Sequence, residues 1–309
     1  NKLEASYGLP AGIRATAGLD YEQKKRNQFR LRSVSSREET DEITVRGELR
    51  RSLGETLTGS VSLARSERDG SSFLNNILNG GGPGSNKIAP LHLADRERDK
   101  FGVSLSWTPT DPLSLQFRAS TSKDDYASRG AEDLGLRDGR ASLVSVDAAY
   151  QITDAWQATA FATQTENKIN QATCAASPAD GTPCTSPVWA ANLRNVSRAV
   201  GVGANGKPLG NLKIGTELAV FRFRDSFGLT LAPVGGPLPD INTRLTTLKL
   251  FVEYALTKAS GLRAHLVHDR YRSDDWTWAN WTYTDGTRVT EDPDQKVNFI
   301  GLSYYYQFR

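Results

Sequence analysis

The last fourteen residues of the chain alternate between two kinds of side chain. Within residues 296–309, apolar or aromatic side chains occupy every second position, at Ile300, Leu302, Tyr304, Tyr306 and Phe308. A period of two with one apolar row predicts a β-strand that has one side against an apolar phase. A terminal strand that ends in aromatic rings is typical of bacterial outer-membrane barrels, whose rings lie at the membrane–water boundary. We therefore expect this row to face lipid.

Alternating segments of the same kind recur along the whole chain. We count about thirteen, each of roughly ten residues with its polar ends, as a tilted membrane strand requires. They are residues 3–7, 13–21, 43–49, 57–63, 101–107, 113–119, 144–150, 156–162, 196–202, 212–220, 248–256, 262–266 and the terminal strand. The sequence thus predicts an all-β chain that forms an antiparallel, up-and-down transmembrane β-barrel with polar side chains toward its lumen.

The connections between these segments alternate between short and long. The short ones, at 8–11, 53–56, 109–112, 152–155, 205–208 and 256–260, contain residues typical of tight turns. The long ones lie near 22–41, 66–95, 124–138, 167–187, 225–242 and 273–294. Outer-membrane barrels have short periplasmic turns and long outer loops. We therefore expect the long connections outside the cell and the C-terminus in the periplasm. A soluble β-sandwich has no reason to alternate strictly between short and long connections.

The composition fits a barrel as well as a soluble protein. The mean hydropathy is −0.48 and 24% of the residues are charged, and no apolar run is long enough for a transmembrane helix. Barrels show such values because only half of each strand faces lipid. The net charge of +3 is small and mixed in sign, which does not indicate nucleic-acid binding. The absence of Met and of a leader is expected of a mature or trimmed chain.

An odd number of strands has a topological consequence. If the last strand ends in the periplasm, the first of thirteen starts on the outer side, whereas single-chain bacterial barrels have an even strand number. We therefore expect at least one strand before Asn1, and residues 1–309 as one region, the C-terminal part of a larger barrel. Strands about 4.8 Å apart and tilted by about 40° give a diameter of ~26 Å for 13 strands and ~52 Å for about 26. Only the wider barrel has room for a folded protein.

The predicted lumen carries charges of both signs. The positions are Arg14, Asp20, Arg46, Glu48, Arg50, Lys100, Arg118, Asp147, Lys213, Glu217, Lys249 and Glu253. Such a surface suits a polar protein partner, and it equally suits a porin that selects small solutes.

Two cysteines, Cys174 and Cys184, flank a stretch rich in Pro, Gly and small residues. We predict a disulfide that closes this loop in an oxidising compartment. A metal pair is less favoured because no His or further Cys lies nearby. The sequence has no Cys-x-x-Cys-His motif, so we expect no covalently bound haem on this chain.

The last long connection contains an aromatic cluster of Trp276, Trp278, Trp281 and Tyr283. It is a candidate docking edge for a partner protein, and an aromatic girdle or a self-packed loop is the favoured alternative. Asp274, Asp275, Asp285, Asp292 and Asp294 in the same region are either solvated or a calcium site.

Histidines offer little for catalysis or metal binding. His265 and His268 are three residues apart on a predicted strand, so they point to opposite faces and cannot chelate one ion. No motif pairs a Ser with a His and an acid, and we do not expect an enzyme.

Residues 238–309 resemble the C-terminal region of the MtrB/PioB family of outer-membrane barrels that associate with decahaem cytochromes. The resemblance rests on three runs, 238–251, 260–287 and 292–308, of which the second contains Asp269-Arg-Tyr-Arg-Ser-Asp-Asp-Trp-Thr-Trp-Ala-Asn-Trp. Earlier stretches, such as Ser122-Lys-Asp-Asp-Tyr, fit more loosely. Some members carry an N-terminal Cys-x-x-Cys that this sequence does not have.

The resemblance implies a barrel of about 26 strands that sheathes a multihaem c-type cytochrome. Electrons would pass along the partner's haems across the outer membrane, to an outer-surface cytochrome or a mineral. The chain itself would carry no redox cofactor and would contact outer-membrane lipid. A general diffusion porin for small solutes is the alternative function.

Overall fold

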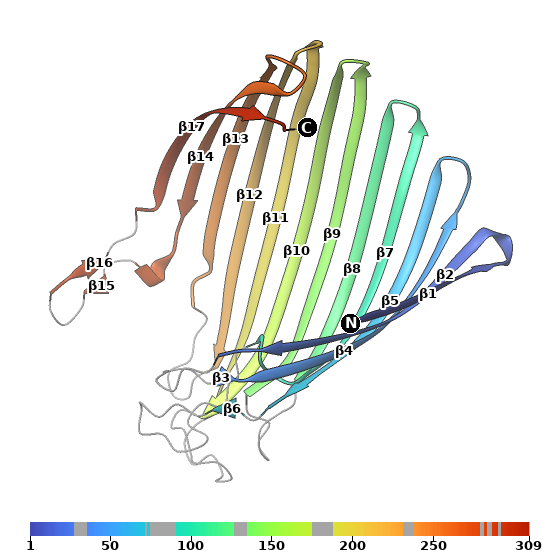
Figure 1. Ribbon diagram of the computed structural model, residues 1–309. Helices are drawn as coiled ribbons and strands as arrows, with labels where there is room; N and C mark the ends of the chain where they lie inside the picture. Colours follow the sequence, from blue (N-terminus) through green and yellow to red (C-terminus); the bar gives the residue numbers. More distant parts are fainter. Residues whose placement is uncertain are drawn as a thin grey trace.

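Thirteen antiparallel strands form one continuous sheet in the computed structural model (Figure 1). The structure describes residues 1–27, 36–71, 73–74, 91–126, 135–174, 188–230, 238–278, 281–282, 286–289 and 292–308. The strands of the sheet are β1 (Lys2–Leu9), β2 (Ile13–Lys25), β4 (Glu39–Ser52), β5 (Leu57–Gly70), β7 (Arg96–Thr110), β8 (Leu113–Tyr126), β9 (Gly135–Thr153), β10 (Trp156–Cys174), β11 (Val188–Leu209), β12 (Leu212–Thr230), β13 (Ile241–Ala255), β14 (Ser260–Ser273) and β17 (Asp294–Tyr306).

The strand order in the sheet follows the chain, so the prediction of thirteen up-and-down antiparallel strands is confirmed. Each of the thirteen predicted segments lies in a separate strand. β1 and β17 are the two edges, and they do not pair with each other. The sheet is therefore an open wall that has not closed into a barrel, which is compatible with the larger barrel expected from the sequence.

Four small strands and two short helices lie in the connections between the strands of the wall. β3 (Ser36–Arg37) pairs with β6 (Phe73–Leu74), and β15 (Trp281–Thr282) pairs with β16 (Arg288–Val289). The short 3₁₀ helices are η1 (Pro10–Gly12) and η2 (Trp276–Trp278). In the part of the chain that the structure describes, no helix has the length and apolar character needed to span a bilayer.

The strands are longer than predicted, which corrects the estimate of roughly ten residues. They reach 22 residues in β11 and 19 residues in β9, β10 and β12. At the end with the long connections, β9–β12 continue beyond the segments in which the outer face is apolar. Cross-strand contacts hold the extension, such as Asn170 Nδ2 to Asp138 (2.9 Å) and Asn192 Nδ2 to Asn170 (2.6 Å). The backbone hydrogen-bond ladder therefore extends beyond the alternating apolar segments from which the strands were predicted.

One of the six predicted turns was placed wrongly. Asn205-Gly-Lys-Pro lies inside β11, and the chain reverses at Gly210–Asn211. The register jumps between Gly206 and Leu209, so Lys207 and Pro208 form an irregularity of the bulge type. Because Pro has no N–H to donate to a ladder, a bulge is a suitable place for it. The Pro therefore marks a bulge before the turn.

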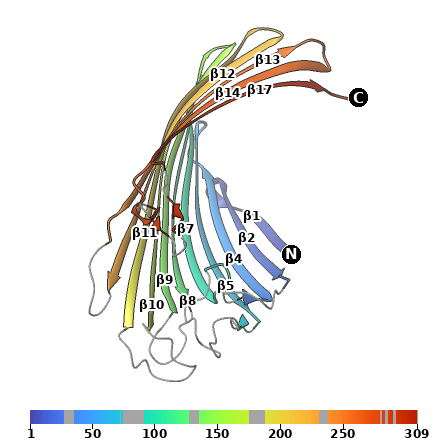
Figure 2. The ribbon, with the colours of Figure 1, turned by 90° about the vertical axis from the view of Figure 1, so that its left-hand side faces the viewer.

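All six short turns lie at one end of the wall, and the strand ends that lead into the long connections lie at the other (Figure 1). The C-terminus is at the short-turn end. The wall is curved, since both chain ends project to the same side while β9–β11 lie opposite them (Figure 2). The sheet thus has a convex outer face and a hollow face.

The apolar rows lie on the outer face. Val200 and Val202 on β11 are 53% and 57% exposed, whereas Gly201 between them is buried. Side chains spread apart on the convex side of a curved sheet and converge on its hollow side, so the more exposed row is the convex one. The same alternation appears in β4, where Ile43 and Val45 are exposed and Thr44 is half-buried. This wall presents its apolar side chains outward, as a barrel in lipid does.

Glycines on the hollow face allow aromatic rings to lie flat against the wall. A Cβ at Gly201 would lie 2.4 Å from the Phe161 ring on β10, and one at Gly215 would lie 2.3 Å from the Phe251 ring on β13. Each glycine faces its ring directly across a strand pair. The missing side chain is thus what lets the ring cover the neighbouring strand.

Placing a charge in the apolar band tests the orientation of the faces. Val202→Arg should destabilise the full-length protein in lipid by about 2–4 kcal/mol, because the charge enters the bilayer core. Val196→Arg, on the same strand and face but nearer the long connections, should cost about 0–1 kcal/mol. Guanidinium unfolding of vesicle-inserted protein, followed by Trp fluorescence, measures both. Equal costs would show that the outer face does not lie in a bilayer.

Candidate functional site

The hollow face carries the charged residues that the sequence places in the lumen, and it brings several of them together. Arg46 on β4 lies between Glu4 (2.6 Å) and Asp20 (3.1 Å). Lys249 Nζ is 3.2 Å from Glu217, and Arg263 is 3.1 Å from Glu253. Arg46 reaches across β2 to Glu4 on β1, whereas the other pairs join neighbouring strands, and all of them lie on the hollow face. These pairs therefore neutralise part of the mixed charge along the wall.

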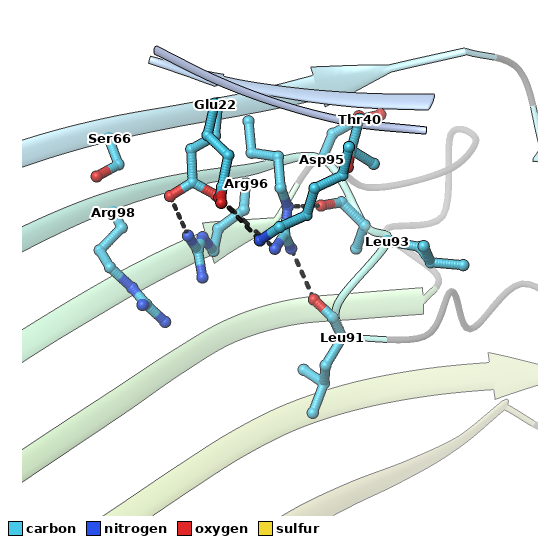
Figure 3. Close-up of polar contacts among 12 residues, drawn as sticks. Glu22, Thr40, Ser66, Leu91, Leu93, Asp95, Arg96 and Arg98 are labelled. Atoms are coloured by element: carbon cyan, nitrogen blue, oxygen red, sulfur yellow. Dashed lines mark hydrogen bonds and ion pairs between the residues drawn. The ribbon is translucent and has the colours of Figure 1, made fainter. Parts of the chain in front are cut away.

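Residues 91–95, at the end of the second long connection, lie against the hollow face. Arg68 on β5 donates from Nε to the carbonyl of Ala94 (2.9 Å) and from Nη2 to that of Leu91 (2.6 Å). Figure 3 shows Leu91, Leu93 and Asp95 beside the side chains that project from the sheet. Hydrogen bonds from a charged group to otherwise buried carbonyls contribute about 1.5–3 kcal/mol each. Arg68 thus holds residues 91–95 against the wall.

Arg37 on β3 holds the same segment from the other side. Its side chain is 4% exposed, and Nη1 donates to the Leu93 carbonyl (2.8 Å) and pairs with Asp95 (2.5 Å). Its Nε donates to the carbonyl of Ser71. One buried guanidinium therefore links both ends of the connection between β5 and β7. We call residues 91–95 the pinned segment.

Acidic side chains on the wall compensate the arginines beneath the pinned segment. Glu42 lies 2.9 Å from Arg96, and Arg98 makes two bonds of 2.5 and 2.7 Å with Asp124. The Tyr126 hydroxyl also donates to Asp124 (3.2 Å). Next to this network, Ala94 of the segment and Leu136 of β9 form a small buried apolar cluster with Tyr126 and Ile169. The pinned segment therefore has both polar and apolar anchors.

The hollow face also has an apolar patch, which the sequence analysis missed. Phe221 on β12, Leu245 on β13 and Tyr271 on β14 lie directly abreast. The patch continues toward the turns through Phe251, Val267, Val297 and Phe299, of which the last two are 56% and 53% exposed. We call these seven residues the hollow patch. It interrupts the polar lining that a water-filled pore would have.

The two histidines lie on opposite faces, as predicted. His265 is on the hollow face and stacks on Phe299 with ring centroids 5.5 Å apart. His268 is on the outer face, where Nδ1 is 2.7 Å from the Asn298 side-chain oxygen. Among the residues that the structure describes, no cluster of three or more His, Cys, Asp or Glu side chains suits a metal ion.

The predicted aromatic cluster is described only in part. Trp276 begins η2, and its indole N–H donates to the Pro239 carbonyl (2.8 Å) across the neighbouring connection. Trp278 and Trp281 have described backbones, while their side chains and all of Tyr283 lie outside the described residues. Trp276 thus packs on its own chain, and the docking edge stays a prediction.

The structure describes the predicted terminal row, but only part of the predicted cysteine pair. Cys174 ends β10 opposite Val188, but its side chain and all of Cys184 lie outside the described residues, so the disulfide stays a prediction. The terminal row lies on the outer face at 77% (Ile300), 76% (Leu302), 60% (Tyr304), 54% (Tyr306) and 87% (Phe308) exposure. β17 ends at Tyr306, so Phe308 follows the strand.

The acidic residues of the last connection have local roles. Asp274 accepts the Asn242 backbone N–H (2.6 Å), and Asp275 accepts that of Thr277 (2.9 Å). Asp292 accepts the N–H of Asp294, whose carboxylate pairs with Arg270 at 2.8 Å. Asp285 lies outside the described residues. These carboxylates cap backbone groups and pair with a base, and the calcium site stays an untested alternative.

The whole chain matches one protein family. The model of the family described as "Putative outer membrane beta-barrel porin, MtrB/PioB" matches residues 1–308. Outer membrane protein MtrB of Shewanella baltica is 24% identical over 278 residues, which cover 89% of this chain and 37% of that protein. The chain therefore spans well under half the length of the curated relative that it matches.

Solved structures share the fold. The copper transporter OprC aligns with a TM-score of 0.61 at 10% identity, over 96% of this chain and 42% of that one. A mutant of the ferric enterobactin receptor PfeA from Pseudomonas aeruginosa aligns with a TM-score of 0.57 at 12% identity, over 94% and 42%. The ferric-catecholate receptor Fiu from E. coli K12 gives 0.54 at 9%, over 92% and 55%. At these identities the likeness shows an outer-membrane barrel wall and nothing of function.

Removing one anchor tests the role of the pinned segment. Arg68→Leu should leave the two accepting carbonyls without a partner and loosen residues 91–95 by about 1–3 kcal/mol. Arg65→Leu on the same strand, but on the outer face, is the matched control. Amide hydrogen exchange of residues 91–95 should be about tenfold faster or more in the first variant and unchanged in the second. Unchanged exchange in both would refute the anchoring role.

Proposed function

The chain belongs to the MtrB/PioB family of outer-membrane β-barrel porins, and from this premise we propose that it forms part of a sheath around a multihaem c-type cytochrome. The cytochrome lies in the lumen and carries electrons across the outer membrane, to an outer-surface cytochrome or another terminal acceptor. The haems belong to that partner. The chain described here positions the partner and keeps lipid away from it, and it acts as no enzyme.

The size of the barrel supports a sheath. The wall has thirteen strands and two unpaired edges, and unpaired backbone groups at an edge are not tolerated in lipid. We propose that residues 1–309 are one membrane region that pairs with further strands into a barrel of about 26, with a diameter of ~52 Å. A lumen of that width is wide enough for a folded protein.

The hollow patch is the observation that favours a protein occupant over a water-filled pore. Phe221, Leu245 and Tyr271 lie on interior strands of the wall, so an adjoining strand does not cover their hollow-side surface. These three side chains are half-buried, and Val297 and Phe299 of the same patch are exposed. Apolar surface of this kind gains free energy when it packs against a partner, and aromatics are enriched at the cores of such interfaces. The surrounding neutralised ion pairs suit the polar rim of the same interface.

The orientation follows from the arrangement of connections. We propose that the six short turns and the C-terminus face the periplasm, and that the long connections face the outside. The outer-face row from Ile300 to Phe308 then contacts lipid. Trp276 and its neighbours would lie at the outer end, where they are placed to meet an outer-surface partner.

A general diffusion porin is the alternative. The charged hollow face favours it, because rings of charged side chains also select solutes. The two functions differ in what occupies the lumen. The full-length protein should be purified from its native membrane through an affinity tag, stained for haem, and reconstituted for ion-conductance measurements. Haem that co-purifies in a constant ratio, with low ion conductance, supports the sheath. Free ion conductance without haem would establish the porin.

Site-specific photocrosslinking makes the same distinction residue by residue. A benzophenone amino acid at Lys249 faces the hollow side, and the same group at Leu250 faces outward on the same strand. Irradiation in native membranes should give a haem-staining protein adduct from position 249, whereas position 250 should give lipid adducts. A haem-staining adduct from position 250 and none from 249 would refute the assignment of the lumen.

A further inference from the structure

The outer face changes from apolar to basic at the end that carries the long connections. On the eight consecutive strands β8–β14 and β17, the first Lys, Arg, Asp or Glu beyond the apolar segment is basic on all strands but β10. The first charged residues, in strand order from β8 to β17, are Lys123, Arg140, Glu166, Arg198, Arg222, Arg244, Arg270 and Lys296. On β10, Lys168 follows Glu166 on the same face. We call the seven basic residues and Lys168 the basic belt.

Three residues of the belt lie side by side. Arg198 on β11 is opposite Arg222 on β12, which is opposite Arg244 on β13, and Arg272 on β14 continues the row. Like charges that face one another directly across strands are destabilising. A row of this kind therefore gains stability from an anion placed over it.

The protein itself leaves this charge uncompensated. Arg222 and Arg244 make no hydrogen bond or ion pair within the described residues, and Arg198 has only the neutral Gln164 as its partner (2.8 Å). Other outer-face arginines nearby do have acids. Arg194 is 2.9 Å from Glu166, and Arg224 pairs with Asp240. The missing acid is thus confined to the row next to the apolar band.

The row borders a concavity that is large enough for an anionic group. A hollow of about 560 Å³ on the outer face is lined by Arg194, Arg198, Arg222, Arg224, Arg244 and Arg272, with Ser226 and Asn242 as further polar groups. Asp274 is the one acid in this lining, and its carboxylate accepts the backbone N–H of Asn242 (2.6 Å). Asp240 at its margin accepts from Ser226 and Arg224, contacts that lower the pKa of its carboxyl. Asp240 therefore stays ionised and neutralises Arg224, leaving the row as the anion-binding part.

Any occupant of this site must be amphipathic, because the belt directly adjoins the apolar band. Val200 and Val220 occupy the next outer-face row toward the turns, beside Arg198 and Arg222. Guanidinium groups match phosphate oxygens in a bidentate geometry, and each basic residue near an anionic lipid surface contributes favourably. We propose that the basic belt binds the phosphate groups of lipids in the leaflet on the long-connection side, with their acyl chains against the apolar band.

The opposite end of the outer face has a different composition. Trp107, Tyr150, Trp156, Tyr254 and Tyr304 lie there on the outer face, as in the aromatic girdle at a membrane boundary. Basic residues at one boundary and aromatic residues at the other fit a bilayer whose phosphate-rich leaflet is the outer one. This inference rests on the outer-membrane barrel and is independent of the cytochrome.

The test compares two triple variants of the full-length protein. Arg198→Gln, Arg222→Gln and Arg244→Gln together remove the row. Arg14→Gln, Arg50→Gln and Arg118→Gln remove the same charge from exposed hollow-face positions. Native mass spectrometry in detergent measures binding of diphosphorylated lipid A, its dephosphorylated form, and inorganic phosphate as a competitor. An unchanged heat-dependent shift on electrophoresis shows that each variant is folded.

We expect the row variant to bind diphosphorylated lipid A at least about tenfold more weakly and the hollow-face variant to bind it as the wild type does. The wild type should prefer the phosphorylated form by a similar factor. If the row variant does not fold, the preference of the wild type for phosphorylated over dephosphorylated lipid A is the result that tests the proposal. No preference, equal loss in both variants, or full displacement by millimolar inorganic phosphate would overturn the proposal. Binding of an acidic protein to the belt in place of lipid would also overturn it.

Discussion

Every backbone N–H and C=O group that lies in lipid must find its partner within the protein, because the bilayer core offers no water. In this chain the requirement is met by one ladder that runs without a break from β1 to β17. The rest of the structure depends on that ladder. It forces side chains to alternate between two faces, and it lets the wall stand without a core of its own. Only six apolar residues of the described part are buried, among them Leu93, Leu136 and Ala219.

The sequence allowed the strands and their faces to be predicted because a period of two is a local property. Outer rows such as Ile43 and Val45 stand out wherever polar residues separate them. The hollow patch was not predicted because Phe221 and Leu245 lie beyond the end of the outer apolar row, where Arg222 and Arg244 take its positions, and a local period does not show that single apolar residues of neighbouring strands lie abreast. The pinned segment was not predicted from the sequence for a different reason. Arg37 and Leu93 are far apart in sequence, and no local pattern reports their contact.

The two faces treat charge differently. On the hollow side, several bases have an acid beside them, as Lys249 has Glu217, although Arg14 lies directly opposite Arg50. On the outer side, Arg222 and Arg244 face each other next to the apolar band, with no acid of the described chain between them. The charge of this outer row is therefore left to be compensated by its surroundings at the edge of that band. The difference is invisible in the overall net charge of +3.

Arg37 and Arg68 hold the pinned segment across the hollow at the end with the long connections. The tight reversals at the other end, such as Gly210–Asn211, project no comparable length of chain over that face. The two ends of the hollow face therefore differ in how much chain covers them. The pinned segment therefore narrows the hollow at the long-connection end, whereas the described turns leave the hollow face uncovered at the other end.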